Sequence, residues 1–162
     1  MDENCKPQAL AQIHEHLAAE LATLTRAADA AQDAATHAEN KPENKYDTRG
    51  LEASYLAGAQ RERAEVVRSM IEHLKRMVCP SFSDDDAIAP TALVELDHDG
   101  VSSHCLILAI GAGIQLSLGA RKVTVITPKS LLGSALMGRF AGDDVTVATP
   151  QGPKTYHIVA VR

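Results

Sequence analysis

A charged segment in the first half of the chain alternates carboxylates with cations: Glu39, Lys41, Glu43, Lys45, Asp47 and Arg49. Carboxylate oxygens are the ligands that Mg²⁺ prefers, and Mg²⁺ commonly takes one or two of them together with other oxygens. A segment of this kind can therefore bring a ligand to a metal ion that another molecule holds. The alternative is a solvated helical turn whose charges alternate and bind nothing.

No other residues form a complete catalytic motif in the sequence. Gly111 and Gly113 begin a G-x-G-x-x-G pattern, but Leu116 takes the third glycine position, which favours a turn between strands. Ser134 lacks the second glycine of a nucleophile elbow. The seven histidines show no ligand cluster, so we expect them on the surface or packed. The sequence therefore predicts no self-contained active site.

The composition narrows the class of protein. A net charge of −5 argues against broad binding to nucleic-acid phosphates, and an aromatic content of 3% without Trp disfavours an aromatic-walled pocket. Cys5, Cys79 and Cys105 are widely spaced and odd in number, which predicts reduced thiols. No secretory signal is visible, and no apolar run approaches the ~20 residues of a membrane span. We expect a soluble, cytoplasmic protein.

The first half of the chain has the periodicity of two helices. In the first helix, apolar residues recur at intervals of three and four, at Leu10, Ile13, Leu17, Leu21, Leu24, Ala28, Ala31 and Ala35. Asn40, Pro42 and Asn44 then break the pattern. In the second helix, which begins at about Asp47 or Thr48, the predicted apolar face runs along Leu51, Tyr55, Gly58, Ala59, Glu62, Val66, Met70, Leu74 and Met77. Two helices of about 30 residues with a short polar break between them predict an antiparallel hairpin about 45 Å long.

Small residues line the distal half of the predicted seam: Ala28, Ala31, Ala35, Gly50, Ala53, Ala57, Gly58 and Ala59. Such residues let two helix axes approach closely, but they bury little apolar area. We therefore expect a thin distal hairpin, suited to insertion into a narrow space rather than to dimerisation, and a monomeric protein.

A proline and three successive aspartates, within residues 80–86, separate the hairpin from the second half. We interpret the aspartates as part of a solvated linker rather than as a metal site. Five segments that follow are rich in Val, Ile and Thr and are predicted strands: residues 92–96, 104–110, 123–126, 145–149 and 156–161.

Turn and cap residues complete the second domain. Residues 97–100 form a predicted hairpin turn. Ser130 is expected to cap a short helix over residues 131–137 that ends at Gly138. The predicted fold class is α+β, a helical hairpin followed by a small domain with about five strands around one helix.

Residues 127–161 resemble the C-terminal domain of the Gre transcript cleavage factors, the GreA/GreB-like transcription elongation factors. The family's signature is roughly S-P-(L/I)-(G/A)-x-(A/G)-L-(L/I)-G-K, then G-D-x-V, then a T-P-x-G turn and a closing strand. The residues that fit it are Ser130, Leu132, Gly133, Ala135, Leu136, Gly138, Gly142, Asp143, Val145, Thr149, Pro150 and Gly152. With the preceding hairpin, the resemblance covers nearly the whole chain in the same order.

The resemblance implies a coiled-coil hairpin over residues 1–79, with its tip at about 39–47, and an FKBP-like domain over residues 80–162. It implies that the chain binds bacterial RNA polymerase, with the globular domain docked at the rim of the secondary channel. The hairpin tip then reaches toward the active-site Mg²⁺ and stimulates cleavage of backtracked RNA, so that its contact with the nascent RNA is indirect. The chain itself is then no enzyme, has no metal or cofactor of its own, and shares only the polymerase Mg²⁺.

The resemblance also assigns roles to two groups of residues. Glu43 and Glu39 would act in trans at the polymerase Mg²⁺. The residues expected to bind the polymerase are Asn40, Asn44, Lys45, Asp47 and Arg49 at the tip, and Ser130, Leu131, Leu132, Leu136 and Gly138 in the second domain.

Three positions depart from the family's pattern. The tip pattern is close to D-x-x-E-N-x-E-Y, and matching Glu43 and Asn44 to its E-N step puts Asn40 where Asp is expected. A neutral amide is a poorer Mg²⁺ ligand than a carboxylate. Leu131 replaces the signature's Pro, and Ser134 stands where a basic residue is common. Two versions of the function stay open, one that stimulates cleavage and one that occupies the channel and competes with other factors.

Two hypotheses come from other classes of protein. A peptidyl-prolyl isomerase would fit an FKBP-like fold, but its pocket needs aromatic walls, and this domain offers only Phe82, Phe140 and Tyr156. A helical adaptor unrelated to polymerase would leave the match over residues 127–161 unexplained.

Overall fold

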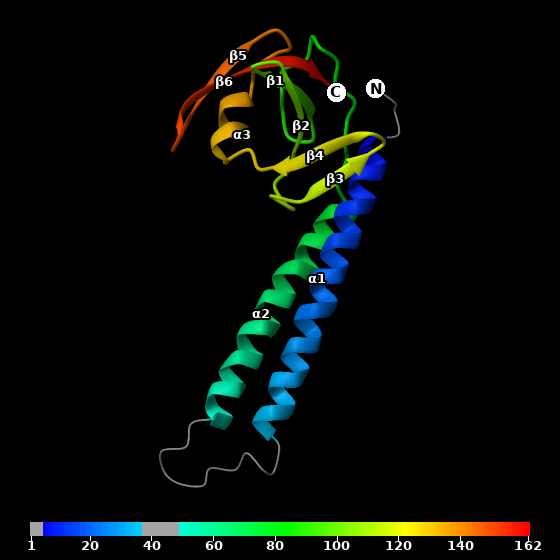
Figure 1. Cartoon of the computed structure of the whole chain (residues 1–162). Helices are drawn as coiled ribbons and strands as arrows, with labels where there is room; N and C mark the ends of the chain where they lie inside the picture. The colour runs from blue at the N-terminus through cyan, green and yellow to red at the C-terminus, as the bar shows by residue number, and fades with distance from the viewer. Residues whose placement is uncertain (1–4, 37–48) are drawn as a thin grey trace. The chain divides into compact units, whose positions relative to one another are not determined.

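The computed structural model describes residues 5–36 and 49–162 (Figure 1). Its elements follow in the order α1 Cys5–Thr36, α2 Arg49–Lys75, β1 Leu93–His98, β2 Val101–Ile107, β3 Gln115–Leu118, β4 Arg121–Ile126, α3 Leu131–Leu136, β5 Asp144–Thr149 and β6 Gly152–Val161. The predicted fold class is confirmed, since two long helices precede a small domain of strands with one short helix.

Contacts divide the chain into two compact units. One unit combines Met1–Ile13 with Met77–Arg162, and the other is His14–Arg76. The first turns of α1 therefore group with the β-rich part of the chain rather than with the rest of the hairpin. The division into residues 1–79 and 80–162 stays a prediction.

The hairpin unit buries the predicted face of α1, but on α2 only Leu74 and Ala57 of the predicted seam residues are buried. Leu17, Ala28 and Ala31 of α1 are buried, as their spacing predicted. On α2 the buried residues are Ala57, Ala64, Val67, Ile71 and Leu74. Arg63 and Arg61 of α2 contact Glu20 and Gln32 of α1, at 3.1 and 3.2 Å, so the two helices lie side by side (Figure 1).

The predicted apolar face of α2 was wrong along most of its length. Leu51, Tyr55 and Val66 are exposed, and Tyr55 keeps 71% of its surface accessible. At about 100° per residue, these positions lie nearly opposite Ala57 and Ala64 on the helix. The sequence prediction followed the larger apolar side chains, but the buried face includes Ala57 and Ala64, whose small side chains allow the two helices to pack closely.

A six-stranded sheet forms the β-rich part, in the order β3-β4-β2-β1-β6-β5. Only β2 and β4 are parallel, and the other neighbouring strands are antiparallel. The sequence missed β3, because its four residues, alternating exposed and buried, are too short for a periodicity signal. The hairpin turn between β1 and β2 is confirmed, with Asp99 and Gly100 both at positive φ, as in the two-residue turns that D-G favours.

One face of this sheet packs against α3. The core on that side comprises Ile88, Ala92, Val94, Leu96, Cys105, Ile107, Leu136, Val145, Ile158 and Val161. Burial raises the pKa of the Cys105 thiol to about 12, so this cysteine stays protonated and unreactive at neutral pH. Cys5, Cys79 and Cys105 are all free, and their redox state stays a prediction.

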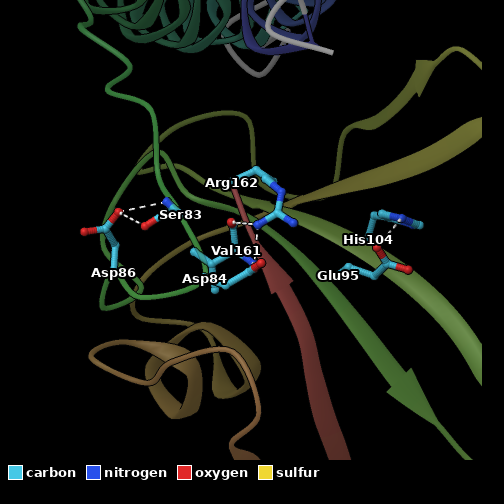
Figure 2. A network of polar contacts seen from close by, with 7 residues as sticks. All are labelled: Ser83, Asp84, Asp86, Glu95, His104, Val161 and Arg162. Carbon is cyan, nitrogen blue, oxygen red and sulfur yellow. Dashed lines mark hydrogen bonds and ion pairs between the residues drawn. The ribbon is translucent and has the colours of Figure 1, made fainter. Parts of the chain in front are cut away.

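The aspartates after the hairpin are more than solvated charges. Asp84 accepts hydrogen bonds from the Val161 backbone N–H (3.0 Å) and from the Arg162 guanidinium (2.5 Å) (Figure 2). Asp86 accepts from both the N–H and the hydroxyl of Ser83, each at 2.8 Å. These bonds lower the pKa of both carboxyls. Asp84 thus ties the connecting segment to the end of β6, and Asp86 closes a turn within it.

Candidate functional site

The charged tip of the hairpin lies outside the described residues. This applies to Glu39, Asn40, Glu43, Asn44, Lys45 and Asp47. Arg49 is described only as the first residue of α2. The roles predicted for these residues stay predictions, and the geometry available for a site is that of the second domain around α3.

Ser130 begins α3 as the sequence predicted. Its hydroxyl accepts a hydrogen bond from the Gly133 N–H (3.1 Å) and donates one to the Thr127 carbonyl (2.7 Å). The cap satisfies one of the amide donors that every helix N-terminus leaves unpaired. The hydroxyl also ties the helix back to the chain that leaves β4, so Ser130 positions α3.

Gly133 explains why α3 can lie so close to the end of β4. A Cβ at this position would meet the Thr127 carbonyl oxygen at 2.0 Å, closer than any real contact. Since that obstacle is backbone rather than a flexible side chain, no other residue fits without moving the helix. The glycine of the signature therefore serves packing rather than chemistry.

The five residues of this domain that were predicted to bind a partner differ in accessibility. Leu131 is 69% exposed and offers its side chain to solvent. Leu136 is fully buried in the core, and Leu132 packs partly against it. Gly138, at positive φ, donates its N–H to the Ile88 carbonyl at 2.8 Å. Of the five, Leu131 is therefore the side chain that a partner can touch directly, and the others hold the surface in place.

Phe140 is a surface residue that the sequence reasoning did not assign to partner binding. It follows α3 and keeps 44% of its surface exposed, in a chain with only two phenylalanines. Its N–H donates to the Asp143 carboxylate at 3.0 Å, which fixes the turn that carries it. An aromatic residue between Gly138 and Gly142 was the signal that could have identified it. Leu131, the first residue of α3, and Phe140, shortly after its end, are two exposed apolar side chains at this helix.

The T-P-x-G segment of the signature is likewise a structural feature. The Thr149 hydroxyl donates to the Gly152 carbonyl at 2.7 Å, and Gly152 has a φ of +115°. The turn joins β5 to β6, and all of β5 pairs with the first part of β6, from Thr149↔Gly152 to Asp144↔His157. Most signature residues in this domain thus stabilise the fold, and few of the signature side chains are exposed for contact with a partner.

The histidines of the sheet are packed against neighbours, as expected. His98 contacts the Thr155 carbonyl through Nδ1 (2.8 Å), and its ring lies 5.1 Å from that of Tyr156. His104 lies opposite Glu95 on the adjacent strand, with 3.8 Å between Nε2 and a carboxylate oxygen (Figure 2). Within residues 5–36 and 49–162, no three His, Cys, Asp or Glu side chains are grouped so that they could hold a metal ion. The helices in those ranges are also too polar or too short to cross a membrane.

Comparison with known proteins finds a family model and relatives to which this chain is similar. Residues 115–162 match the model described as transcription elongation factor, GreA/GreB, C-terminal. The Mycobacterium tuberculosis uncharacterized protein Rv3788 is 27% identical over 163 residues, covering 100% of this chain and 98% of the relative. The transcription inhibitor protein Gfh1 of Thermus aquaticus is 29% identical over 120 residues, covering 72% of this chain and 71% of the relative.

Solved structures of Gfh1 overlap this chain loosely. One, of the transcription factor Gfh1, covers 96% of this chain and 94% of its own at 23% identity, with a TM-score of 0.42. Another, from Thermus thermophilus, covers 92% and 94% at 24% identity, with a TM-score of 0.38. Scores of this size do not by themselves establish a shared arrangement.

The family match spans β3 to β6, and in this chain those strands follow two long helices. Over these residues the chain is similar to the C-terminal part of GreA/GreB transcription elongation factors.

Proposed function

We propose that this chain binds bacterial RNA polymerase and inhibits or redirects its catalysis through the hairpin, without being an enzyme itself. The observation that carries this proposal is the match of residues 115–162 to the GreA/GreB C-terminal model in a chain that begins with a helical hairpin. In this proposal the β-rich domain docks at the rim of the secondary channel, with Leu131 and Phe140 among its contacts. The tip reaches toward the active-site Mg²⁺, which the polymerase supplies.

The alanine seam of the hairpin supports insertion into a channel. Ala28, Ala31, Ala57 and Ala64 are all buried between α1 and α2. Alanine side chains allow a close approach of the two helix axes, so the hairpin is thinner than one packed through leucines. A thin hairpin is suited to insertion into a narrow channel.

Occupation of the channel is the version that we favour over cleavage. Asn40 stands where the family's tip pattern has Asp, and a neutral amide binds Mg²⁺ less well than a carboxylate. One relative of this chain, Gfh1 of Thermus aquaticus, is named a transcription inhibitor. Stimulated cleavage is the second candidate, because Glu43 is retained and Glu39 adjoins the altered position.

An isomerase function finds no support in the aromatic residues of the domain. Lys6 lies over the Phe82 ring, 4.5 Å from its centroid, and Tyr156 packs against His98. Neither ring is therefore free to wall a prolyl pocket, and Phe140 alone is exposed.

The deciding experiment uses a backtracked elongation complex made with the polymerase of the source organism. RNA cleavage and nucleotide addition are measured with the wild type, Asn40→Asp and Glu43→Ala, and with Asp29→Ala as an exposed carboxylate control on α1. We expect the wild type to slow nucleotide addition without cleavage, Asn40→Asp to gain cleavage, and Asp29→Ala to match the wild type. Cleavage by the wild type that Glu43→Ala abolishes would favour the second candidate, and absence of polymerase binding would refute both.

A further inference from the structure

One stretch of the β-rich unit carries no negative side chain. All 21 Asp and Glu of the chain lie outside residues 100–142, although the net charge of the whole chain is −5. Four cations lie within the same stretch: Arg121, Lys122, Lys129 and Arg139. All four are exposed. The stretch from β2 to the residues after α3 is therefore cationic in a protein that is acidic as a whole.

Two of these cations flank α3, where the exposed apolar side chains lie. Lys129 comes two residues before Leu131, and Arg139 comes directly before Phe140. Among the described residues of this unit, Arg162 is the one Lys or Arg that forms an ion pair with a carboxylate. The charges beside α3 are thus not neutralised by any described residue of the chain.

The acidic residues that follow this stretch make contacts elsewhere in the domain. The Asp143 carboxylate accepts the Phe140 N–H at 3.0 Å, and Asp144 pairs with His157 at 2.8 Å. Both residues lead into β5 or begin it. They leave the cations at the two ends of α3 available to a partner.

The backbone on either side of α3 is fixed by hydrogen bonds. Before the helix, the Ser130 hydroxyl donates to the Thr127 carbonyl. After the helix, the Arg139 carbonyl accepts the Ile88 N–H, and the Gly138 N–H donates to the Ile88 carbonyl, both at 2.8 Å. A fixed backbone lowers the conformational entropy that binding must remove, so the exposed side chains are suited to an interface.

The four side chains lie close enough to share one interface. α3 has six residues and is therefore about 9 Å long, well within the width of an ordinary protein interface. We call this set the α3 surface: Lys129, Leu131, Arg139 and Phe140.

We propose that the α3 surface recognises an acidic surface of RNA polymerase, where carboxylates border an apolar site. This inference rests on the proposed function and adds the chemistry of the polymerase surface that it needs. Unpaired cations in an interface attract the carboxylates of a partner and raise the rate of association. Apolar side chains that lose water in the complex mainly slow dissociation.

The side chains of the α3 surface favour a protein over a nucleic acid as the partner. Binding to phosphates needs many cations, and this surface offers only Lys129 and Arg139. Stacking of successive bases needs several aromatic rings, and Phe140 is the single ring of the surface. Leu131, an aliphatic side chain, suits an apolar site on a protein.

Charge reversal tests the proposal in the full-length protein. The association rate constant with the polymerase of the source organism is measured by stopped-flow fluorescence over a range of salt concentrations. For Lys129→Glu combined with Arg139→Glu, we expect this constant to fall about tenfold at low salt and to lose most of its salt dependence. Lys129→Gln combined with Arg139→Gln removes the same charges without reversing them and should lower the constant about threefold.

The matched control changes the same number of charges at the other end of β4. Arg121→Glu combined with Lys122→Glu alters the first two residues of that strand, which leads toward α3. We expect the association rate constant of this control to stay within about twofold of the wild type. Leu131→Ala should instead speed up dissociation about tenfold and keep the salt dependence of the wild type.

The outcomes separate this inference from the proposed function. Polymerase binding whose association rate is the same at all salt concentrations, or in both charge variants, would overturn the inference and leave the proposed function standing. A wild type that does not bind polymerase would overturn both. Circular dichroism checks that each variant is folded.

Two other partners are tested with the same variants. Binding of a single-stranded RNA oligonucleotide, or dimerisation seen by analytical ultracentrifugation, would overturn the proposal if the Lys129 and Arg139 variants abolished it. The surface would then belong to a nucleic acid or to a second copy of this chain. We expect neither interaction at the concentrations of the polymerase assay.

Discussion

The hairpin and the β-rich domain are each stabilised internally by a different kind of interaction. The hairpin seam is a line of alanines with a few larger residues near its base. The exposed Arg61 and Arg63 of α2 make polar contacts with α1 beside this seam. The β-rich domain has backbone pairing across six strands and turns that accept only certain residues. Because of this difference, we expect similar substitutions to change stability by very different amounts in the two parts. The signature residues of the β-rich domain can therefore be retained in a chain whose tip residues differ from the family's pattern.

The strongest contrast between the two regions is expected from adding one methyl group to a glycine. Gly133→Ala places a Cβ against the Thr127 carbonyl, so α3 must move, and we expect a loss of about 3 kcal/mol in the free energy of unfolding. The matched change in the hairpin is Gly58→Ala, which meets nothing within 4 Å and should stabilise α2 by about 0.5–1 kcal/mol. Chemical denaturation of both variants measures the difference. Equal effects would contradict the contrast.

The choice of seam on α2 is tested by truncating side chains on its two faces. Ile71→Ala removes a buried side chain and is expected to cost about 2–3 kcal/mol. Tyr55→Ala removes an exposed one and should change stability by less than about 0.5 kcal/mol. Thermal unfolding monitored by helical circular dichroism compares them. If Tyr55→Ala proves the more damaging change, the face predicted from the sequence would be the true seam.

Acid should weaken the attachment of the connecting segment before it affects the seam. The Arg162 guanidinium and the Val161 N–H lower the pKa of Asp84 below its unfolded value, so its contribution is fully present above that unfolded value. The contribution is lost as the pH falls through the lowered pKa. Asp84→Asn should therefore flatten the dependence of stability on pH below about pH 4. Asp85→Asn, in the same aspartate run, is the control, and a profile unchanged in Asp84→Asn would refute this attachment.

A smaller effect is expected at Thr91, which precedes β1. This β-branched residue has a φ of +76°, and its buried hydroxyl has no hydrogen-bond partner among the described residues. Thr91→Gly relieves the backbone strain and removes the unpaired hydroxyl. It also loses a buried methyl and makes the unfolded chain more flexible, both of which oppose folding. We expect the free energy of unfolding to rise by about 1 kcal/mol in total. Thr91→Val, which keeps the strain, should gain less. A destabilised glycine variant, in the same denaturation assay, would show that the methyl contact outweighs the strain.

Local patterns in the sequence predicted those features whose cause is local. The α1 face, the Asp99-Gly100 turn, the Ser130 cap and most of the strands follow from spacing and turn chemistry within a few residues. The family resemblance over residues 127–161 is of the same kind, since most of its residues are required by caps and turns. The charged tip was also identified from sequence, and its role stays a prediction.

Tertiary structure decided what depends on residues far apart in the chain. Ala57 was expected in the seam, but only the packed hairpin shows that Ala64 and Val67 continue the seam on α2 while Tyr55 and Val66 are exposed. β3 is too short to be recognised alone and exists because β4 pairs with it. Asp84 and Gln12 looked like ordinary polar residues until the fold brought them to Arg162 and Ser117, 78 and 105 residues away. A hydrogen bond needs both partners at about 3 Å, and for such distant partners only the complete fold supplies that proximity.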